Sequence, residues 1–117
     1  MTDSRVCARF HRAIELIGTR WSGAILRAVV TGHHRYAHIK AAVPGLSDTM
    51  LATRLRSLEV DGLIERSVLA TSPVSVEYHL TRMGRELEPI LDSLVAWSHT
   101  WITLPAGEED RDDDHPS

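Results

Sequence analysis

Cysteine is almost absent from the chain, which has only Cys7 among its 117 residues. A single thiol cannot close a disulfide within the chain, and it cannot supply the several sulfur ligands of a cysteine-built zinc site. Long apolar runs are absent as well, since no stretch reaches the length of about 18 residues that a membrane span needs. Residues 1–12 also lack the apolar core of a signal peptide. We therefore expect one small cytosolic (cytoplasmic) globular domain that neither spans a membrane nor is exported.

Lysine is equally scarce, because Lys40 is the only one and arginine supplies nearly all of the positive charge. The formal net charge of −3 is unevenly distributed. Residues 108–114 hold six carboxylates and one arginine, a charge of −5, so the rest of the chain carries +2. Such a polar segment cannot bury enough apolar surface to fold, so we expect a disordered acidic tail at 105–117 after a domain at 1–104. The basic body suits a phosphate-bearing partner, although coding bias in a GC-rich genome gives the same excess of arginine.

Apolar residues recur at helical spacing in five segments that glycine or proline separates. The predicted helices cover residues 7–17, 20–31, about 35–43, 48–61 and 82–102. The apolar stripes are Phe10, Ala13, Ile14 and Ile17 in the first helix and Trp21, Ala24, Ile25, Ala28 and Val29 in the second. The stripe expected to be buried in the fourth helix is Leu51, Leu55 and Leu58. Thr19, Ser47 and Thr81 stand where N-caps are expected. Pro89 should kink the last helix or break it near Glu88.

Two segments rich in β-branched and aliphatic residues, Leu63–Leu69 and Val76–Leu80, follow the fourth helix. The six residues between them include Pro73, so the pair is predicted to form a β-hairpin. The fold class is therefore mostly α with a small β-hairpin (α+β). Two helices joined by a turn at Pro44-Gly45 and followed directly by a hairpin have the order of a winged helix-turn-helix.

In that fold the third helix braces the fourth, whose outward face can enter the major groove of DNA. The candidates for contacts to bases are Ser47, Thr49, Met50, Thr53 and Arg56. The candidates for contacts to phosphates are Arg35, Lys40 and Arg66. The alternative for both sets is an ordinary solvated surface.

The same residues resemble a known family. CARF at 7–10, IELIGTRW at 14–21, PGLS at 44–47 and DGLI at 61–64 are similar to motifs of the HxlR-type winged-helix transcriptional regulators. The resemblance extends over about residues 7–101. It implies a dimeric DNA-binding regulator related to the MarR type, usually a repressor, and several such proteins sense oxidants or electrophiles through an N-terminal cysteine. The family often has proline directly after that cysteine, where this chain has Ala8.

Cys7 lies beside Arg5 and Arg9 and one helical turn before His11, near the expected start of a helix. These features favour the reactive thiolate, so we consider Cys7 a redox-sensing site modulated by His11. The alternative is a small buried hydrophobic residue. Because the chain has one cysteine, any disulfide must join two molecules.

The last predicted helix carries Trp97 and Trp101 four residues apart, too much apolar surface for a small domain to cover. We expect the terminal helices, at about 7–17 and 82–102, to be buried in a homodimer. The residues expected to line the dimer seam or a pocket for a small-molecule effector are Phe10, Trp21, Leu94, Trp97 and Trp101. A core within one chain is the alternative.

Histidine is concentrated at His33, His34 and His38, with His34 and His38 on one face if their helix begins early. A metal site needs further ligands, which no nearby carboxylate or cysteine supplies, so we expect no metal and no cofactor. The chain also lacks a nucleophile paired with a base, so we expect it not to be an enzyme. The hypothesis is a sequence-specific regulator that binds a pseudo-palindromic double-stranded operator. The alternative is a winged-helix module that binds another protein instead of DNA.

Overall fold

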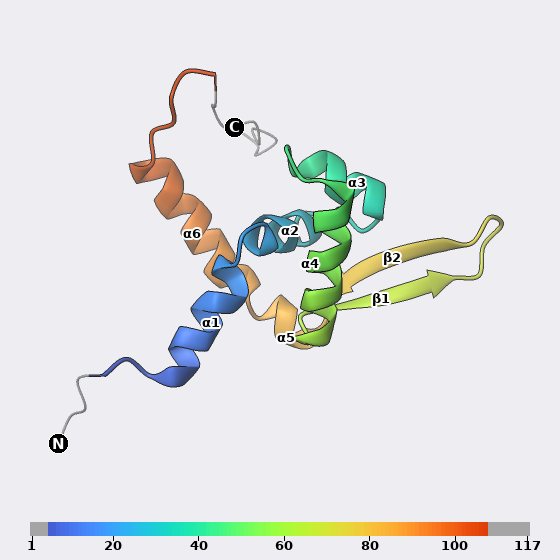
Figure 1. Ribbon diagram of the computed structural model, residues 1–117, viewed down its shortest axis with the longest axis horizontal. Coiled ribbons are helices and arrows are strands. Elements are labelled where there is room, and N and C mark those ends of the chain that lie inside the picture. The colour runs from blue at the N-terminus through green and yellow to red at the C-terminus, as the bar shows by residue number, and fades with distance from the viewer. Residues whose placement is uncertain (1–4, 108–117) are drawn as a thin grey trace. The chain divides into compact units, whose positions relative to one another are not determined.

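The computed structural model describes residues 5–107, and Figure 1 shows its helices and strands. The elements are α1 (Ala8–Gly18), α2 (Ser22–Val30), α3 (Tyr36–Ala42), α4 (Asp48–Val60), β1 (Ile64–Leu69), β2 (Ser75–Leu80), α5 (Arg82–Arg85) and α6 (Glu88–Trp101). The chain divides into two compact units, Met1–Leu87 and Glu88–Ser117. Most of the expected acidic tail lies outside the described residues. Within them, no helix has both the length and the apolarity to cross a membrane.

The turn between α1 and α2 differs from its prediction. Thr19 does not cap α2, because its hydroxyl donates to the carbonyl of Glu15 at 2.6 Å and so closes α1. The N-cap of α2 is Trp21, whose φ of 77° lies in the left-handed region. That conformation costs an L-residue with a side chain about 1–2 kcal/mol, so surrounding contacts must hold it. Only a tight turn separates α1 from α2, and in it the N–H of Ser22 donates to the carbonyl of Thr19 at 2.9 Å.

The buried stripe of α2 is also shifted from the predicted one. Ala24 is exposed, whereas Ser22 and Leu26 are buried together with Ile25 and Val29. Positions 22, 25, 26 and 29 share one face of a helix. The prediction placed Trp21 on the helix, but the helix begins one residue later and Ser22 occupies the first buried position.

α4 is anchored as predicted. The hydroxyl of Ser47 accepts the N–H of Met50 at 3.1 Å, which satisfies one donor of the first turn. Leu51, Leu55 and Leu58 form its buried stripe and are at most 2% exposed. Their burial fixes which face of α4 is left to solvent.

The hairpin pairs β1 with β2 in antiparallel register from Ile64 opposite Leu80 to Leu69 opposite Ser75. Only its base joins the core, since Ile64 and Tyr78 are buried whereas Val68 and Val74 near the tip are exposed. The hairpin therefore projects beyond α4 as a wing (Figure 1). The winged α+β fold predicted from the order of elements is confirmed.

The break predicted near Glu88 is confirmed, because α5 ends at Arg85 and α6 begins at Glu88. Thr81 caps α5 as expected, with its hydroxyl accepting the N–H of Gly84 at 3.1 Å. The same hydroxyl donates to the carbonyl of Gly62 at 2.6 Å, which ties the end of the hairpin to the end of α4.

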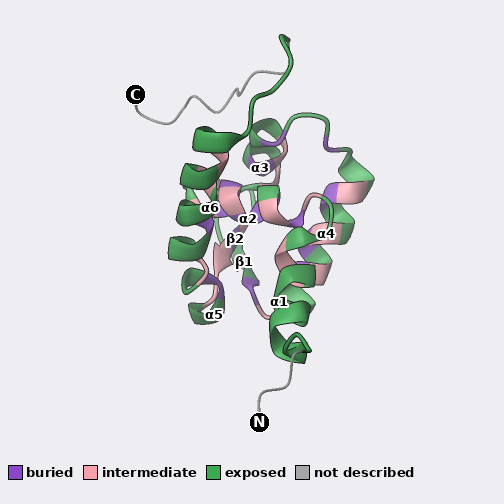
Figure 2. Ribbon diagram, turned by 90° about the vertical axis from the view of Figure 1, so that its left-hand side faces the viewer, coloured by how far each residue is buried: buried purple, intermediate pink, exposed green. Residues whose placement is uncertain are grey.

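Burial is uneven among the helices (Figure 2). It is concentrated in α2, α4 and the base of the hairpin, whereas α1 has no buried residue and α6 has only Leu91. The apolar stripe predicted for α1 is thus largely unburied within a single chain. Phe10 is 58% exposed and Ile14 is 48% exposed.

Gly84→Ala is expected to destabilise the protein by about 2–3 kcal/mol, because a methyl group there overpacks a filled site. Gly84 is buried, and its Cβ would collide with the carbonyl oxygen of Leu63. Urea unfolding should show a lower midpoint. Gly18→Ala is the control, since a Cβ there meets the nearest Ile14 carbon at an ordinary 3.9 Å. Equal midpoints for the two variants would contradict this packing.

Candidate nucleic-acid interface

The outward face of α4 is polar and carries short side chains near its start. Thr49, Thr53 and Arg56 are exposed, and their spacing places them on one side of the helix. Two hydroxyls donate to α4 itself, Thr53 to the carbonyl of Thr49 at 2.9 Å and Ser57 to that of Thr53 at 3.1 Å. The hydroxyl oxygens keep their lone pairs and can still accept from a base.

Ser47 and Met50 also lie at the start of this face. The hydroxyl of Ser47 is exposed and, because it accepts the N–H of Met50, still has its proton to donate. Met50 is half-buried, so it presents only part of its thioether side chain to solvent. Four of the five residues predicted to contact bases therefore lie at the N-cap or in the first two turns of α4, and Arg56 lies about one turn after Thr53.

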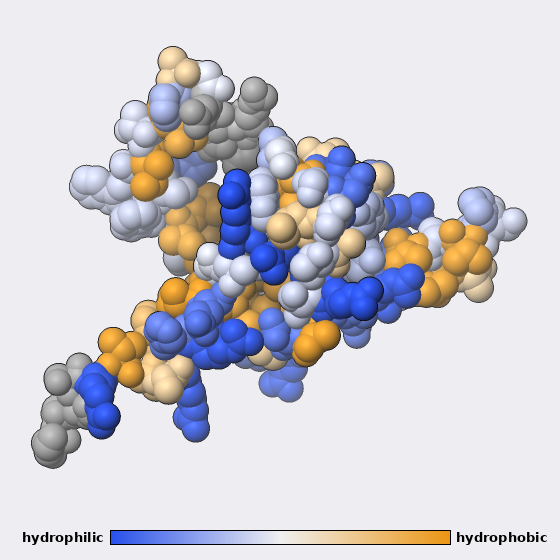
Figure 3. Space-filling view, viewed as in Figure 1, coloured by the Kyte–Doolittle hydropathy of each residue, from blue (hydrophilic) through white to orange (hydrophobic). Residues whose placement is uncertain are grey.

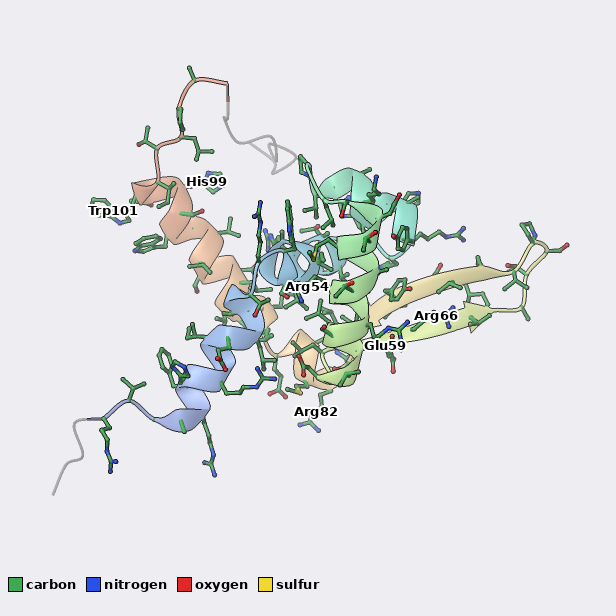
Figure 4. All side chains as sticks on the ribbon, in the orientation of Figure 1. Arg54, Glu59, Arg66, Arg82, His99 and Trp101 are labelled. Carbon is green, nitrogen blue, oxygen red and sulfur yellow. The ribbon has the colours of Figure 1, made fainter. Side chains whose placement is uncertain are left out.

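A groove of about 570 Å³ separates α4 from the hairpin. Its lining residues are Tyr36, Ala52, Leu55, Arg56, Glu59, Val60, Arg66 and Tyr78. The guanidinium groups of Arg56 and Arg66 come from opposite walls, and Figure 4 shows Glu59 and Arg66 next to each other between α4 and β1. The groove is thus suited to an anion, with Glu59 as the one acidic group in its lining.

Two of the predicted phosphate contacts are engaged with carboxylates on the surface. Arg35 Nε lies 3.8 Å from Glu77 Oε2, and Lys40 Nζ lies 3.7 Å from Asp48 Oδ1. Pairs that are this long and this exposed contribute little to stability. Both cations can therefore exchange the carboxylate for a phosphate at small cost.

The tip of the wing differs in character from its base. Hydrophilic side chains gather where α4 meets the hairpin, whereas apolar side chains extend along the outer part of the hairpin (Figure 3). The connecting residues 70–74 include no cation. The arginine of the wing, Arg66, therefore lies on strand β1 and not at the tip.

His34 and His38 do not share a helix face, because α3 begins only at Tyr36 and not early enough to include His34. His34 is instead bound to the hairpin. Its carbonyl accepts the N–H of Tyr78 at 2.7 Å, its Nδ1 lies 3.1 Å from the carbonyl of Tyr78, and its ring stacks on that of His79 at 4.2 Å. Among residues 5–107, no three potential ligands are grouped to hold a metal ion.

Glu77 completes this histidine cluster. The cluster was not predicted from the sequence. Its Oε1 lies 2.8 Å from His79 Nε2, and this hydrogen bond, with the nearby charges of His79 and Arg35, holds the pKa of Glu77 below its ordinary value. The alternation of apolar and polar residues along 76–80 could have indicated that Glu77 and His79 are neighbours, since positions 77 and 79 share one face of a strand. The cluster fixes the base of the wing to the segment before α3.

Cys7 is exposed and stands at the N-cap of α1. The backbone N–H groups of Phe10 and Arg9 favour its thiolate and hold the pKa of the thiol below its ordinary value. The alternative of a buried hydrophobic residue is therefore wrong for the single chain. His11 is directed elsewhere, because its Nε2 lies 3.9 Å from Glu15 Oε2.

Large apolar side chains are exposed on both terminal helices. On α6, Leu94 is 51% exposed, Trp97 55% and Trp101 70%. Trp21, predicted to belong with them, is half-buried, and its ring lies 3.6 Å from where a Cβ of Gly45 would be. Its packing against the α3–α4 turn gives Trp21 a role inside the Met1–Leu87 unit.

Comparison with known proteins decides the family. Residues 16–105 match the family model described as HxlR-like helix-turn-helix. The chain belongs to the HxlR-like family. The family is one of transcriptional regulators, which agrees with the winged fold and with the resemblance found in the sequence.

Relatives of this HxlR-like chain include two helix-turn-helix (HTH)-type transcriptional regulators of Bacillus subtilis. The chain is 38% identical to YvaP over 102 residues, 87% of this chain and 94% of YvaP. It is 37% identical to YodB over 93 residues, 80% of this chain and 83% of YodB.

Solved structures lead to the same family. The oxidised form of the redox regulator HypR superimposes with a TM-score of 0.77 at 31% identity, covering 83% of this chain and all of HypR. The reduced form of YodB from Bacillus subtilis gives a TM-score of 0.73 at 35% identity, covering 84% and 96% of the two chains. DNA binding by the HxlR-like chain is therefore supported by its relatives as well as by its fold.

Proposed function

We propose that the protein is a homodimeric, sequence-specific repressor of transcription that reads double-stranded DNA with α4. The observation that carries this proposal is the solvated polar face of α4, held outward by the buried stripe on the opposite side. Ser47, Thr49, Met50, Thr53 and Arg56 read base edges. Arg35, Lys40 and Arg66 bind phosphates on either side, and each adds about one unit to the salt dependence of binding.

Dimerisation joins the terminal helices, at about 7–17 and 82–102, within a domain of residues 1–104. It is supported by the exposed apolar residues Phe10, Ile14, Leu94, Trp97 and Trp101. Apolar surface contributes about 25 cal/mol per Å² when it is buried, so pairing of these helices gives a strong driving force. Two copies of α4 then face a two-fold symmetric, pseudo-palindromic operator. Such a regulator works in the cytoplasm, where the chromosome of a bacterium lies.

The signal is oxidation or alkylation of Cys7, which changes the distance or angle between the two copies of α4. The exposed thiol at a helix N-terminus, with its lowered pKa, supports this part of the proposal. A disulfide formed by Cys7 joins either the two subunits or the protein and a small thiol. A small ligand bound near Trp97 and Trp101 is the alternative signal.

The rate of Cys7 alkylation by iodoacetamide is expected to rise with pH at a midpoint below that of an unperturbed thiol, about 8.5. The lowered pKa keeps more of the sulfur as thiolate at neutral pH. The midpoint is obtained from rates measured between about pH 5 and 10, a range that spans the pKa of an ordinary thiol. The same protein in concentrated urea is the control and should titrate as an ordinary thiol. Identical midpoints for folded and unfolded protein would contradict activation at the N-cap.

Salt dependence separates DNA binding from the alternative, a module that binds protein. Affinity for fluorescent fragments of genomic DNA is measured by anisotropy at rising salt concentration. The logarithm of the binding constant should fall linearly with the logarithm of the salt concentration. The three phosphate contacts of each subunit, six in the dimer, account for a slope of about −5. Absence of measurable affinity at low salt would contradict the proposal and favour a protein partner.

A further inference from the structure

The turn that joins α1 to α2 is held in a strained conformation beside the recognition helix. Trp21 is the one non-glycine residue with positive φ between residues 5 and 107. Its indole lies against Gly45 in the turn before α4, and the guanidinium of Arg20 lies 4.9 Å from the centre of the indole ring. Because a left-handed tryptophan persists only when its surroundings hold it, contacts with other elements must fix this turn.

Arg54 supplies one such contact from the middle of α4. Its Nε donates to the carbonyl oxygen of Arg20 at 3.1 Å, across 34 positions of sequence. Arg54 is half-buried, unlike the exposed Thr53 and Arg56 on the DNA-facing side. Figure 4 shows Arg54 between α4 and α2. Its guanidinium is therefore committed to the α1–α2 turn and not to the outward face.

A second contact joins α1 to the far end of α4. Arg12 Nη2 lies 3.5 Å from Oδ1 of Asp61, the C-cap residue of α4. The segment from α1 to the turn thus contacts α4 at its middle and its end, and contacts the turn before α4 through Trp21. One contact thus lies in the middle of α4, one at its C-cap and one in the turn before it, so a tilt of α4 would break these contacts or displace α1 and its turn.

We propose that Arg54 is a positioning residue that locks the recognition helix to the α1–α2 turn, so that the placement of α1 sets the placement of α4. This inference rests on the proposed function, in which α1 belongs to the dimer interface and α4 reads DNA. In a dimer, the lock fixes the separation of the two copies of α4. Arg54 therefore determines which half-site spacing is bound, without contacting DNA itself.

The test compares binding to operators whose half-sites are moved apart or together by one or two base pairs. Arg54→Met keeps the apolar stem and removes the donor, and Arg54→Lys keeps the charge but removes the Nε–H. Arg82→Met is the matched control, because Arg82 lies in α5, is not among the apolar residues proposed to join the subunits, and pairs locally with Glu86. We expect both Arg54 variants to lose about tenfold in affinity at the preferred spacing and to change little at the others. Arg82→Met should keep the spacing profile of the natural protein.

Three results would overturn the lock. An unchanged spacing profile shows that Arg54 does not position α4. A uniform loss at all spacings, with a salt slope reduced by about two, one for each subunit, in Arg54→Met but not in Arg54→Lys, identifies Arg54 as a phosphate contact. A uniform loss together with a lower melting temperature shows only a structural role.

Hydrogen exchange keeps the lock testable if the natural protein binds no DNA, a result that would contradict the proposed function by itself. Arg54→Met should speed amide exchange about tenfold in residues 19–25 and 44–47, where the turn and the start of α4 are held. Arg82→Met should leave these amides unchanged. Unaltered exchange in Arg54→Met would overturn the lock independently of DNA binding.

Discussion

Thr53→Ala combined with Arg56→Ala is expected to lower the affinity for the operator by at least about 100-fold. Each well-formed contact to a base contributes about 1–3 kcal/mol of discrimination, so losing two removes most of the preference over other DNA. The fold should survive, because both side chains are exposed and Thr53 donates only within α4. Fluorescence anisotropy at physiological salt measures the loss, and the melting temperature reports on the fold.

A matched control removes the same two side-chain types elsewhere. Thr100 of α6 donates to the carbonyl four residues earlier, as Thr53 does, and the side chain of Arg82 is 88% exposed. Thr100→Ala with Arg82→Ala should leave specific binding within about twofold of the natural protein. Full retained affinity in the α4 double variant would show that α4 does not read the operator.

Replacing both Leu94 and Trp97 by glutamate is expected to raise the dissociation constant of the dimer at least about 100-fold. Burying one large apolar side chain contributes about 1.5–3 kcal/mol, and two such residues are lost from each subunit. Both are about half exposed in the single chain, so the monomer should stay folded. Sedimentation velocity over a range of concentrations gives the dissociation constant, and circular dichroism gives the helix content.

Ala96→Glu is the control for the added charge. Ala96 is exposed on α6, on the side away from Leu94 and Trp97 at 100° per residue. This variant should dimerise like the natural protein. A dimer that survives the double substitution would place the subunit interface elsewhere and leave the exposed face of α6 without that role.

The parts of the fold that local chemistry dictates were predictable from the sequence. The 3.6-residue spacing of Leu51, Leu55 and Leu58, with Ser47 as N-cap, was enough to orient α4 and so to identify its outward face. Pro89 was enough to indicate the break before α6. Both features depend on residues within one or two helical turns.

Features that depend on distant contacts were not predictable. His34 lies beside β2 because its ring forms a hydrogen bond with the carbonyl of Tyr78, which lies 44 positions later in the chain. Trp21 adopts a left-handed conformation because its indole packs against the α3–α4 turn, and no local pattern indicates that. An apolar stripe also looks the same whether its own chain or a second chain covers it, so the spacing of Phe10 and Ile14 could not show that both are exposed in the single chain.

Selection of bound DNA from a random pool tests whether two copies of α4 read one operator. We expect enrichment of a two-fold symmetric sequence with half-sites about 10 base pairs, or 34 Å, apart, or a multiple of that distance. The Thr53 and Arg56 double variant should enrich no such sequence. Recovery of an unsymmetrical single site, or no enrichment by the natural protein, would contradict the account.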